Sequence, residues 1–97
     1  MKLYVINNYG REAHGQDVTI GYASSKEEAD DIARIDWEHL TDIEKKAIGS
    51  EYVINVYEVP DTLLYRGLNL VTIAREMLDL GLMDTDDNMC SQYIINA

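Results

Sequence analysis

Residues 51–60, EYVINVYEVP, decide the fold of this chain. β-branched and aromatic residues recur through the segment, which is typical of a strand, and Pro60 ends it. Residues 2–9, KLYVINNY, have the same character and are its expected pairing partner. Residues 10–16 form a polar turn between glycine-containing ends, and residues 17–23 read as the second strand of a hairpin. The first and third strands therefore pair across a long sequence separation.

Two helices are expected between the hairpin and the strand at 51–59. Ser25 and Glu28 belong to overlapping capping boxes, which indicate a helix start. Apolar residues then recur every three or four positions and share one face: Ala29, Ile32, Ala33, Trp37 and Leu40. Thr41 and Glu44 form another capping box, which predicts a short helix over residues 42–48.

The C-terminal third is expected to hold one more helix and a short strand. Residues 68–80 are helical by pattern, with Asn69 as a candidate N-cap and a wide apolar arc. Residues 84–88 read as an acidic loop and residues 92–95 as an edge strand. The order β-β-α-α-β-α-β predicts an α+β fold, in which two to three helices pack on one face of a small antiparallel sheet. At 97 residues, the chain 1–97 fits a single compact acidic domain.

Charge is the outstanding feature of the composition. The chain has 18 Asp and Glu residues against 8 Lys and Arg, a net charge of -10. This charge repels phosphate backbones, so we expect no direct nucleic-acid binding and an attraction to basic protein grooves. Cys90 is the only cysteine, which excludes an internal disulfide and fits a reducing cytoplasm. No apolar stretch approaches the roughly 18 residues of a membrane helix, so no membrane span is expected.

No motif predicts catalysis, a cofactor or a metal. Asp84, Asp86 and Asn88 match the start of a calcium loop, but Met89 and Ile95 stand where its glycine and glutamate are needed. The two histidines lack metal-binding spacing, and the glycines form no phosphate loop. We therefore expect a protein that is not an enzyme. A small enzyme that uses His39, Asp36 or Cys90 is a third reading, after the two binding functions considered below.

Asp36 projects from the apolar face of its predicted helix, where an unpaired carboxylate is costly. We expect either a distortion of the helix or a compensating cation such as Arg34, Arg66 or Arg75. The functional alternative is a recessed acid that contacts a partner.

The acidic residues are the main candidates for partner binding. Carboxylates three or four residues apart on a helix stand about 5 to 6 Å from each other, comparable to phosphates along a nucleic-acid strand. One such row comprises Glu27, Asp30, Asp31, Glu38 and Asp42, and a second patch comprises Asp84, Asp86 and Asp87. The alternative is an ordinary solvated face diluted by nearby lysine and arginine side chains. Three tyrosines near the ends of predicted elements are candidate contacts or structural residues: Tyr9, Tyr22 and Tyr65.

A Tyr-rich first strand, an acidic composition and the phrase LTDIEKK at 40–46 give the chain a general resemblance to small proteins of phages and prophages. Among these it is similar in character to anti-CRISPR proteins. The resemblance implies a stoichiometric inhibitor that mimics nucleic acid, occupies the basic DNA-binding groove of a CRISPR surveillance complex or nuclease, and blocks target DNA. The alternative is an acidic protein–protein interaction module, or a homodimer without mimicry in which the helix at 68–80 packs between copies.

Overall fold

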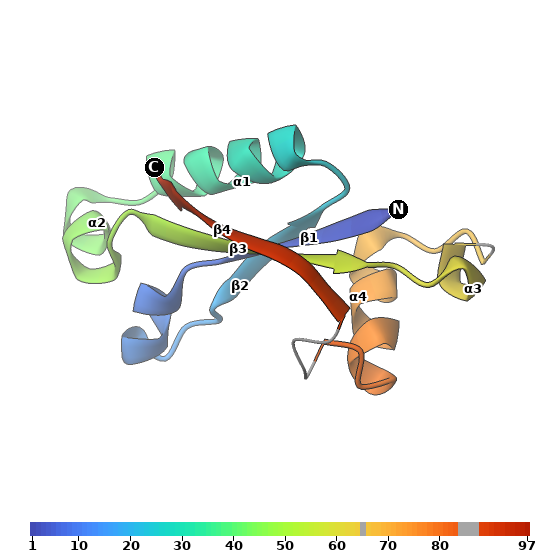
Figure 1. Cartoon of the computed structure of the whole chain (residues 1–97). Helices are drawn as coiled ribbons and strands as arrows, with labels where there is room; N and C mark the ends of the chain where they lie inside the picture. The colour runs from blue at the N-terminus through green and yellow to red at the C-terminus, as the bar shows by residue number, and fades with distance from the viewer. Residues whose placement is uncertain (65, 84–87) are drawn as a thin grey trace.

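An antiparallel sheet with the strand order β2-β1-β3-β4 organises the molecule (Figure 1). The computed structural model describes residues 1–64, 66–83 and 88–97. Its strands are β1 (Lys2–Asn7), β2 (Thr19–Ala23), β3 (Glu51–Glu58) and β4 (Met89–Asn96). The predicted long-range pairing is confirmed, because Leu3 lies opposite Tyr57 in the register of β1 with β3.

Three of the five described helices, α1 (Lys26–Glu38), α2 (Asp42–Ile48) and α4 (Leu70–Asp79), begin where the sequence places their caps. The other two are the 3-10 helix η1 (Tyr9–His14) and α3 (Asp61–Leu64). The Ser25 side chain accepts a hydrogen bond from the Glu28 backbone N–H at the start of α1. Thr41 and Glu44 form the predicted capping box of α2. Asn69 caps α4 by accepting from the Thr72 N–H at 2.9 Å.

The α+β class is confirmed, but the prediction that the helices pack on one face of the sheet is wrong. Ile6 and its β3 neighbours pack with the alanines of α1, whereas Leu3 and Val5 pack with α4. In Figure 1, α1 runs along one side of the sheet and α4 lies on the other side near one end. Consecutive residues of a strand point to opposite faces, and β1 and β3 are apolar on both, so each face needs a cover.

Three local features differ from the sequence prediction. Residues 9–14 form η1 where a turn was expected, and α3 follows Pro60 without having been predicted. A single helical turn is too short to carry a readable apolar period. The final strand spans Met89–Asn96 and not only residues 92–95, because it pairs with β3 along almost its whole length despite its mixed polar sequence.

Candidate partner-binding surface on α1

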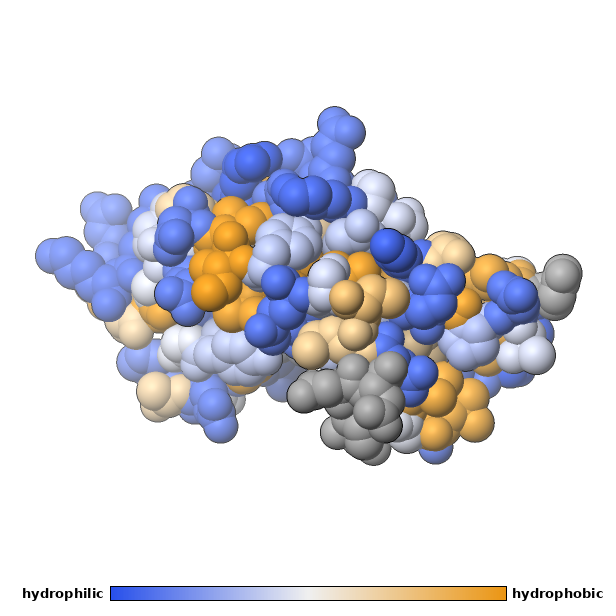
Figure 2. All heavy atoms as spheres, in the orientation of Figure 1, coloured by the Kyte–Doolittle hydropathy of each residue, from blue (hydrophilic) through white to orange (hydrophobic). Residues whose placement is uncertain are grey.

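The outer side of α1 carries a row of exposed carboxylates. Glu27, Asp31 and Glu38 are exposed, and their separations of four and seven residues place them on one stripe of the helix. Asp42 is exposed at the first residue of α2, beyond the end of α1. We call Glu27, Asp31, Glu38 and Asp42 the acidic ridge. Figure 2 shows hydrophilic side chains gathered over the side of the molecule where α1 lies.

Asp30 belongs to a different side of α1 from the ridge. Its carboxylate accepts a hydrogen bond from the Tyr93 hydroxyl at 3.0 Å and pairs with Lys26 at 2.7 Å. The Lys26 ammonium also lies 4.9 Å from the centroid of the Tyr93 ring. Burial raises the pKa of Tyr93, and the hydrogen bond to Asp30 raises it further. Asp30 therefore ties α1 to β4, and its charge is already compensated.

Arg34 compensates only part of the negative charge of the acidic ridge. Its guanidinium lies 3.3 Å from the Asp31 carboxylate, and both side chains are more than half exposed, at 58% and 59%. An ion pair this exposed is screened by water and contributes little stability, so both groups can exchange partners readily. Asp31 therefore stays accessible to a cation on another protein.

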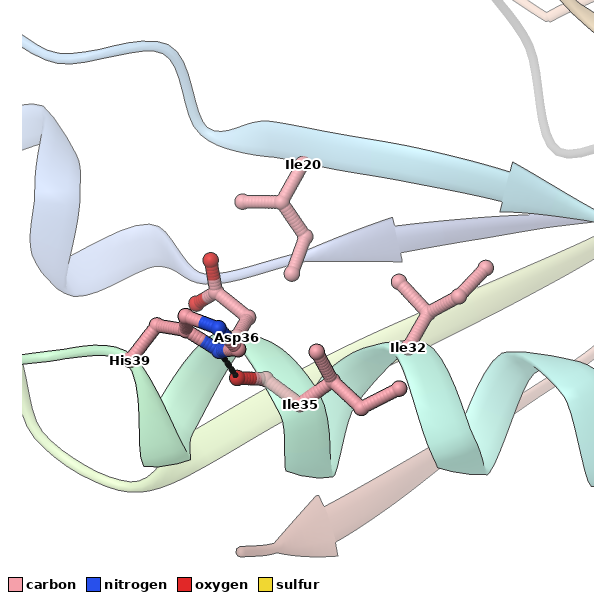
Figure 3. Close-up of a pocket in the computed structure, with 5 residues that line it drawn as sticks. All are labelled: Ile20, Ile32, Ile35, Asp36 and His39. Atoms are coloured by element: carbon pink, nitrogen blue, oxygen red, sulfur yellow. Dashed lines mark hydrogen bonds between the residues drawn. The ribbon is translucent and has the colours of Figure 1, made fainter.

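An apolar groove lies beside the acidic ridge, between α1 and β2 (Figure 3). It encloses about 380 Å³ and is lined by Ile20, Ile32, Ile35, Asp36 and His39. Ile35 is 53% exposed at its rim, one of several large apolar side chains that are exposed on the described surface. The His39 ring packs back on its own helix, with Nδ1 2.8 Å from the Ile35 carbonyl oxygen. Carboxylates and an apolar anchor thus lie on neighbouring stripes of α1.

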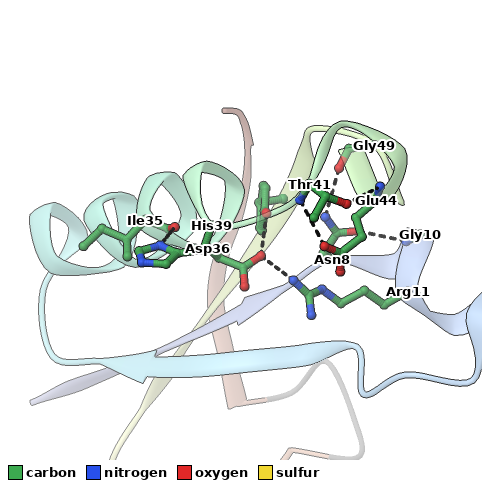
Figure 4. A network of polar contacts seen from close by, with 10 residues as sticks. Asn8, Gly10, Arg11, Ile35, Asp36, His39, Thr41, Glu44 and Gly49 are labelled. Carbon is green, nitrogen blue, oxygen red and sulfur yellow. Dashed lines mark hydrogen bonds and ion pairs between the residues drawn. The ribbon is translucent and has the colours of Figure 1, made fainter. Parts of the chain in front are cut away.

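Asp36 closes the inner end of the groove, and its Oδ2 atom has two partners. Arg11 Nη2 lies 2.5 Å from Asp36 Oδ2 (Figure 4). The Tyr52 hydroxyl donates to the same oxygen at 2.6 Å. Burial raises the pKa of Tyr52 to about 12, with the hydrogen bond and the charge of Asp36 adding to the shift. The predicted compensation of Asp36 is therefore confirmed. The cation is Arg11, and the three arginines proposed from the sequence are not its partners.

The docking of η1 on α2 positions Arg11. The Asn8 side chain accepts from the Gly10 N–H at 3.0 Å and donates to the Gly49 carbonyl at 3.1 Å. Gly10 passes so close to α2 that a Cβ there would lie 1.8 Å from the Ile48 carbonyl oxygen. Sequence reasoning missed this arrangement, although Arg11 is the only cation between Lys2 and Lys26 and was a readable signal.

The remaining candidate residues do not gather around the ridge in the described part of the chain. Tyr9 is 50% exposed at the start of η1. Tyr22 is half-buried against the core on the α4 side, which is a structural position. Tyr65, Asp84, Asp86 and Asp87 lie outside the described residues, and with them most of the calcium-like motif.

Only some of the apolar residues of the helix predicted at 68–80 are buried. Ile73, Ala74 and Met77 of α4 are buried in the chain's own core. Val71 and Leu78 remain 57% and 47% exposed, and Leu80 beyond the helix is 62% exposed. Packing of α4 between two copies therefore stays an untested alternative.

Comparison with protein-family models, curated proteins and solved structures finds no significant match to this chain. Within residues 1–64, 66–83 and 88–97, no three His, Cys, Asp or Glu side chains gather as a metal site. None of the helices in this described part is both long and apolar enough to cross a membrane.

Proposed function

We propose that the protein is a stoichiometric inhibitor that acts in the cytoplasm by occupying the basic DNA-binding groove of another protein, as anti-CRISPR proteins of the mimic type do. The observation that carries the proposal is the acidic ridge, a row of exposed carboxylates on one stripe of α1 continued by Asp42. A folded row of carboxylates can replace a phosphate backbone in a groove lined with Lys and Arg.

The spacing of the ridge supports this proposal. A helix rises 1.5 Å per residue, so Glu27 and Asp31 are offset by about 6 Å along the axis, and Asp31 and Glu38 by about 10 Å. The first interval resembles the spacing of neighbouring phosphates along a strand, and the second is shorter than two such steps. Electrostatic attraction by such a row accelerates association and is weakened by salt.

The groove beside the acidic ridge offers apolar contacts, which can give the lasting affinity that charge alone does not provide. Surface ion pairs contribute little lasting affinity, whereas a desolvated apolar anchor slows dissociation. Ile35 is exposed next to the ridge stripe and is the apolar side chain best placed for this role. A bound partner would cover Ile35 and the groove together with the carboxylates.

The proposal is tested first by a pull-down of the tagged protein from cells that express DNA-targeting defence systems, with duplex DNA as competitor. We expect recovery of a DNA-binding complex that DNA displaces and that higher salt releases. Recovery of a partner indifferent to both DNA and salt would contradict mimicry and favour the interaction-module alternative.

A ridge variant then tests the location of the binding surface. Glu27→Gln, Asp31→Asn, Glu38→Gln and Asp42→Asn together should weaken partner binding by about tenfold or more at physiological salt. The matched control removes the same charge from exposed positions elsewhere: Glu12→Gln, Asp17→Asn, Glu51→Gln and Asp79→Asn. Equal weakening by both variants would mean that only net charge matters, and the ridge would lose its role.

The apolar anchor is tested separately by dissociation rates. Ile35→Ser should speed dissociation from the captured partner, because it removes an apolar contact without changing charge. Val71→Ser on α4 is the control, since Val71 is similarly exposed at 57%. Identical dissociation rates for both variants and the parent protein would exclude the groove from the interface.

A further inference from the structure

The outer edge of β4 is the second unusual surface of the molecule. β4 spans eight residues, Met89–Asn96, and pairs with β3 on one side. Within the described residues, no strand pairs with its other side. The opposite edge strand, β2, is shorter at five residues and is interrupted by an irregular register against Ile6 and Asn7. A long unpaired strand edge is a template for pairing with another chain.

The composition of β4 departs from that of the rest of the chain. Residues 88–97, NMCSQYIINA, contain no charged side chain, although the whole chain has a net charge of -10. The usual protections of an exposed edge are a lysine, a proline or an inward-pointing charge, and this segment has none of them. Ile94 is 57% exposed on it. The segment has the character of a strand that is covered in its working state.

We propose that β4 pairs antiparallel with β4 of a second copy, forming a two-fold symmetric dimer with a continuous sheet. The composition of the edge, and not the charge of the whole chain, favours a second copy as the occupant. Two chains of net charge -10 repel each other over most of their surfaces, but residues 88–97 carry no charged side chain, so two copies can approach each other closely along this edge. A basic partner strand would form no ion pair with β4, because β4 has no carboxylate and the nearby Asp30 is already paired with Lys26.

The side chains of β4 favour a register centred on Ile94. In antiparallel pairing, opposite residues lie on the same face of the sheet. In a symmetric dimer, the two-fold axis can pass midway between one residue and the same residue of the second copy. With Ile94 opposite its own copy, Tyr93 faces Ile95 and Gln92 faces Asn96. Aromatic and β-branched cross-strand pairs stabilise a sheet, and this register covers the exposed Ile94.

The dimer also bears on the proposed function, although its existence does not rest on that function. The two-fold axis of this dimer is perpendicular to the sheet, so the same face of each copy lies on the same side of the extended sheet. Both α1 helices, which pack over β1 and β2, would then lie on one face of the extended sheet. At about 4.8 Å per strand, their axes would be separated by roughly 25 to 30 Å. Two acidic ridges would face the same direction.

The oligomeric state tests the proposal directly. We expect sedimentation at micromolar concentration to give twice the 11.0 kDa chain mass for the parent protein. Ile94→Lys should shift it to monomer, because two like charges would meet at the axis, and Val71→Lys should leave the dimer intact. A mixture of Ile94→Lys with Ile94→Glu should restore a heterodimer, a result that misfolding of either variant cannot produce.

Cross-linking fixes the register. In a Cys90→Ser background, Ile94→Cys should form an intermolecular disulfide rapidly on mild oxidation, since opposite Cβ atoms lie about 4.5 to 5.5 Å apart. Val71→Cys in the same background should not. A monomeric parent protein at all concentrations would overturn the proposal, as would a dimer lost through Val71→Lys but retained through Ile94→Lys. Neither outcome would affect the ridge tests described above.

Discussion

The two faces of the sheet are covered by helices that are held in different ways. α4 buries Ile73, Ala74 and Met77 in an apolar cluster with Leu3 and Val5. α1 fully buries only two of its residues, Ala29 and Ala33, and its last turn is held by the polar cluster of Asp36, Arg11 and Tyr52. Small residues let α1 lie close to the sheet while most of its circumference stays free for charged side chains. Both faces have an apolar core, and the α1 face adds a polar cluster and the exposed carboxylates of the acidic ridge.

The largest expected effect is on the α4 face. Met77→Ala should lower the free energy of unfolding by about 2 to 5 kcal/mol, because the side chain is fully buried and its loss leaves a cavity. Denaturant titration measures this effect. Leu78→Ala, the neighbouring exposed position on α4, should cost much less. Equal losses for the two variants would mean that the α4 core is not packed as described.

On the α1 face, the next effect to test is that of the ion pair between Arg11 and Asp36. Arg11→Ala should cost about 2 to 3 kcal/mol, somewhat below the value for a fully buried pair, because the Asp36 side chain keeps 23% exposure. The double variant Arg11→Met with Asp36→Leu should recover only part of the loss, because it also removes the acceptor of the Tyr52 hydroxyl. A double-mutant cycle measures the coupling, and additive losses would show that the pair is not a unit.

Tyr52→Phe should have a smaller effect, about 1 to 2 kcal/mol at neutral pH, because it removes one hydrogen bond to a carboxylate. The variant should also change the response to alkali. In the folded protein the Tyr52 phenol keeps its proton up to a pKa of about 12, whereas a tyrosine in the unfolded chain loses it near the ordinary pKa of 10.0. The Tyr52 contribution is therefore complete below pH 10 and is lost between pH 10 and 12.

Thermal unfolding across that pH range checks the alkaline response. The parent protein should lose more stability between pH 10 and 12 than Tyr52→Phe does. The same slope in both proteins would show that the Tyr52 proton is not more tightly held in the folded state.

The smallest expected stability effect belongs to the ridge. Each neutralisation in the ridge variant should change the unfolding free energy by at most about 0.5 kcal/mol, because the side chains are exposed. Calorimetry of the quadruple variant measures the sum. A large loss of stability would mean that the ridge carboxylates support the fold, and would remove the contrast between the two faces.

Local signals in the sequence account for most of the fold. The capping residues Ser25, Thr41 and Asn69 mark helix starts, because each accepts from a backbone N–H group that has no acceptor within its own helix. The division of helices between the two faces was not predictable in the same way. An apolar stripe identifies the buried side of a helix but does not say which face of the sheet covers it.

The site was predictable only in part. The helical period places Glu27, Asp31 and Glu38 on one stripe, and the structure retains that stripe. The orientation of Asp30 depends on Tyr93, which lies 63 residues away, and the pairing of Asp36 depends on Arg11 in η1. Contacts of this kind follow from the tertiary arrangement, so the sequence indicates that a cation is needed without naming it.

The contact between Gly10 and α2 constrains how the sequence can diverge. A side chain at position 10 would collide with the Ile48 carbonyl, a backbone atom that no rotamer change can move aside. A distant relative that keeps this fold should therefore keep glycine at this position while its surface carboxylates drift. Among such relatives, a conserved glycine eight residues after the start of the first strand would be a better marker of common ancestry than acidity.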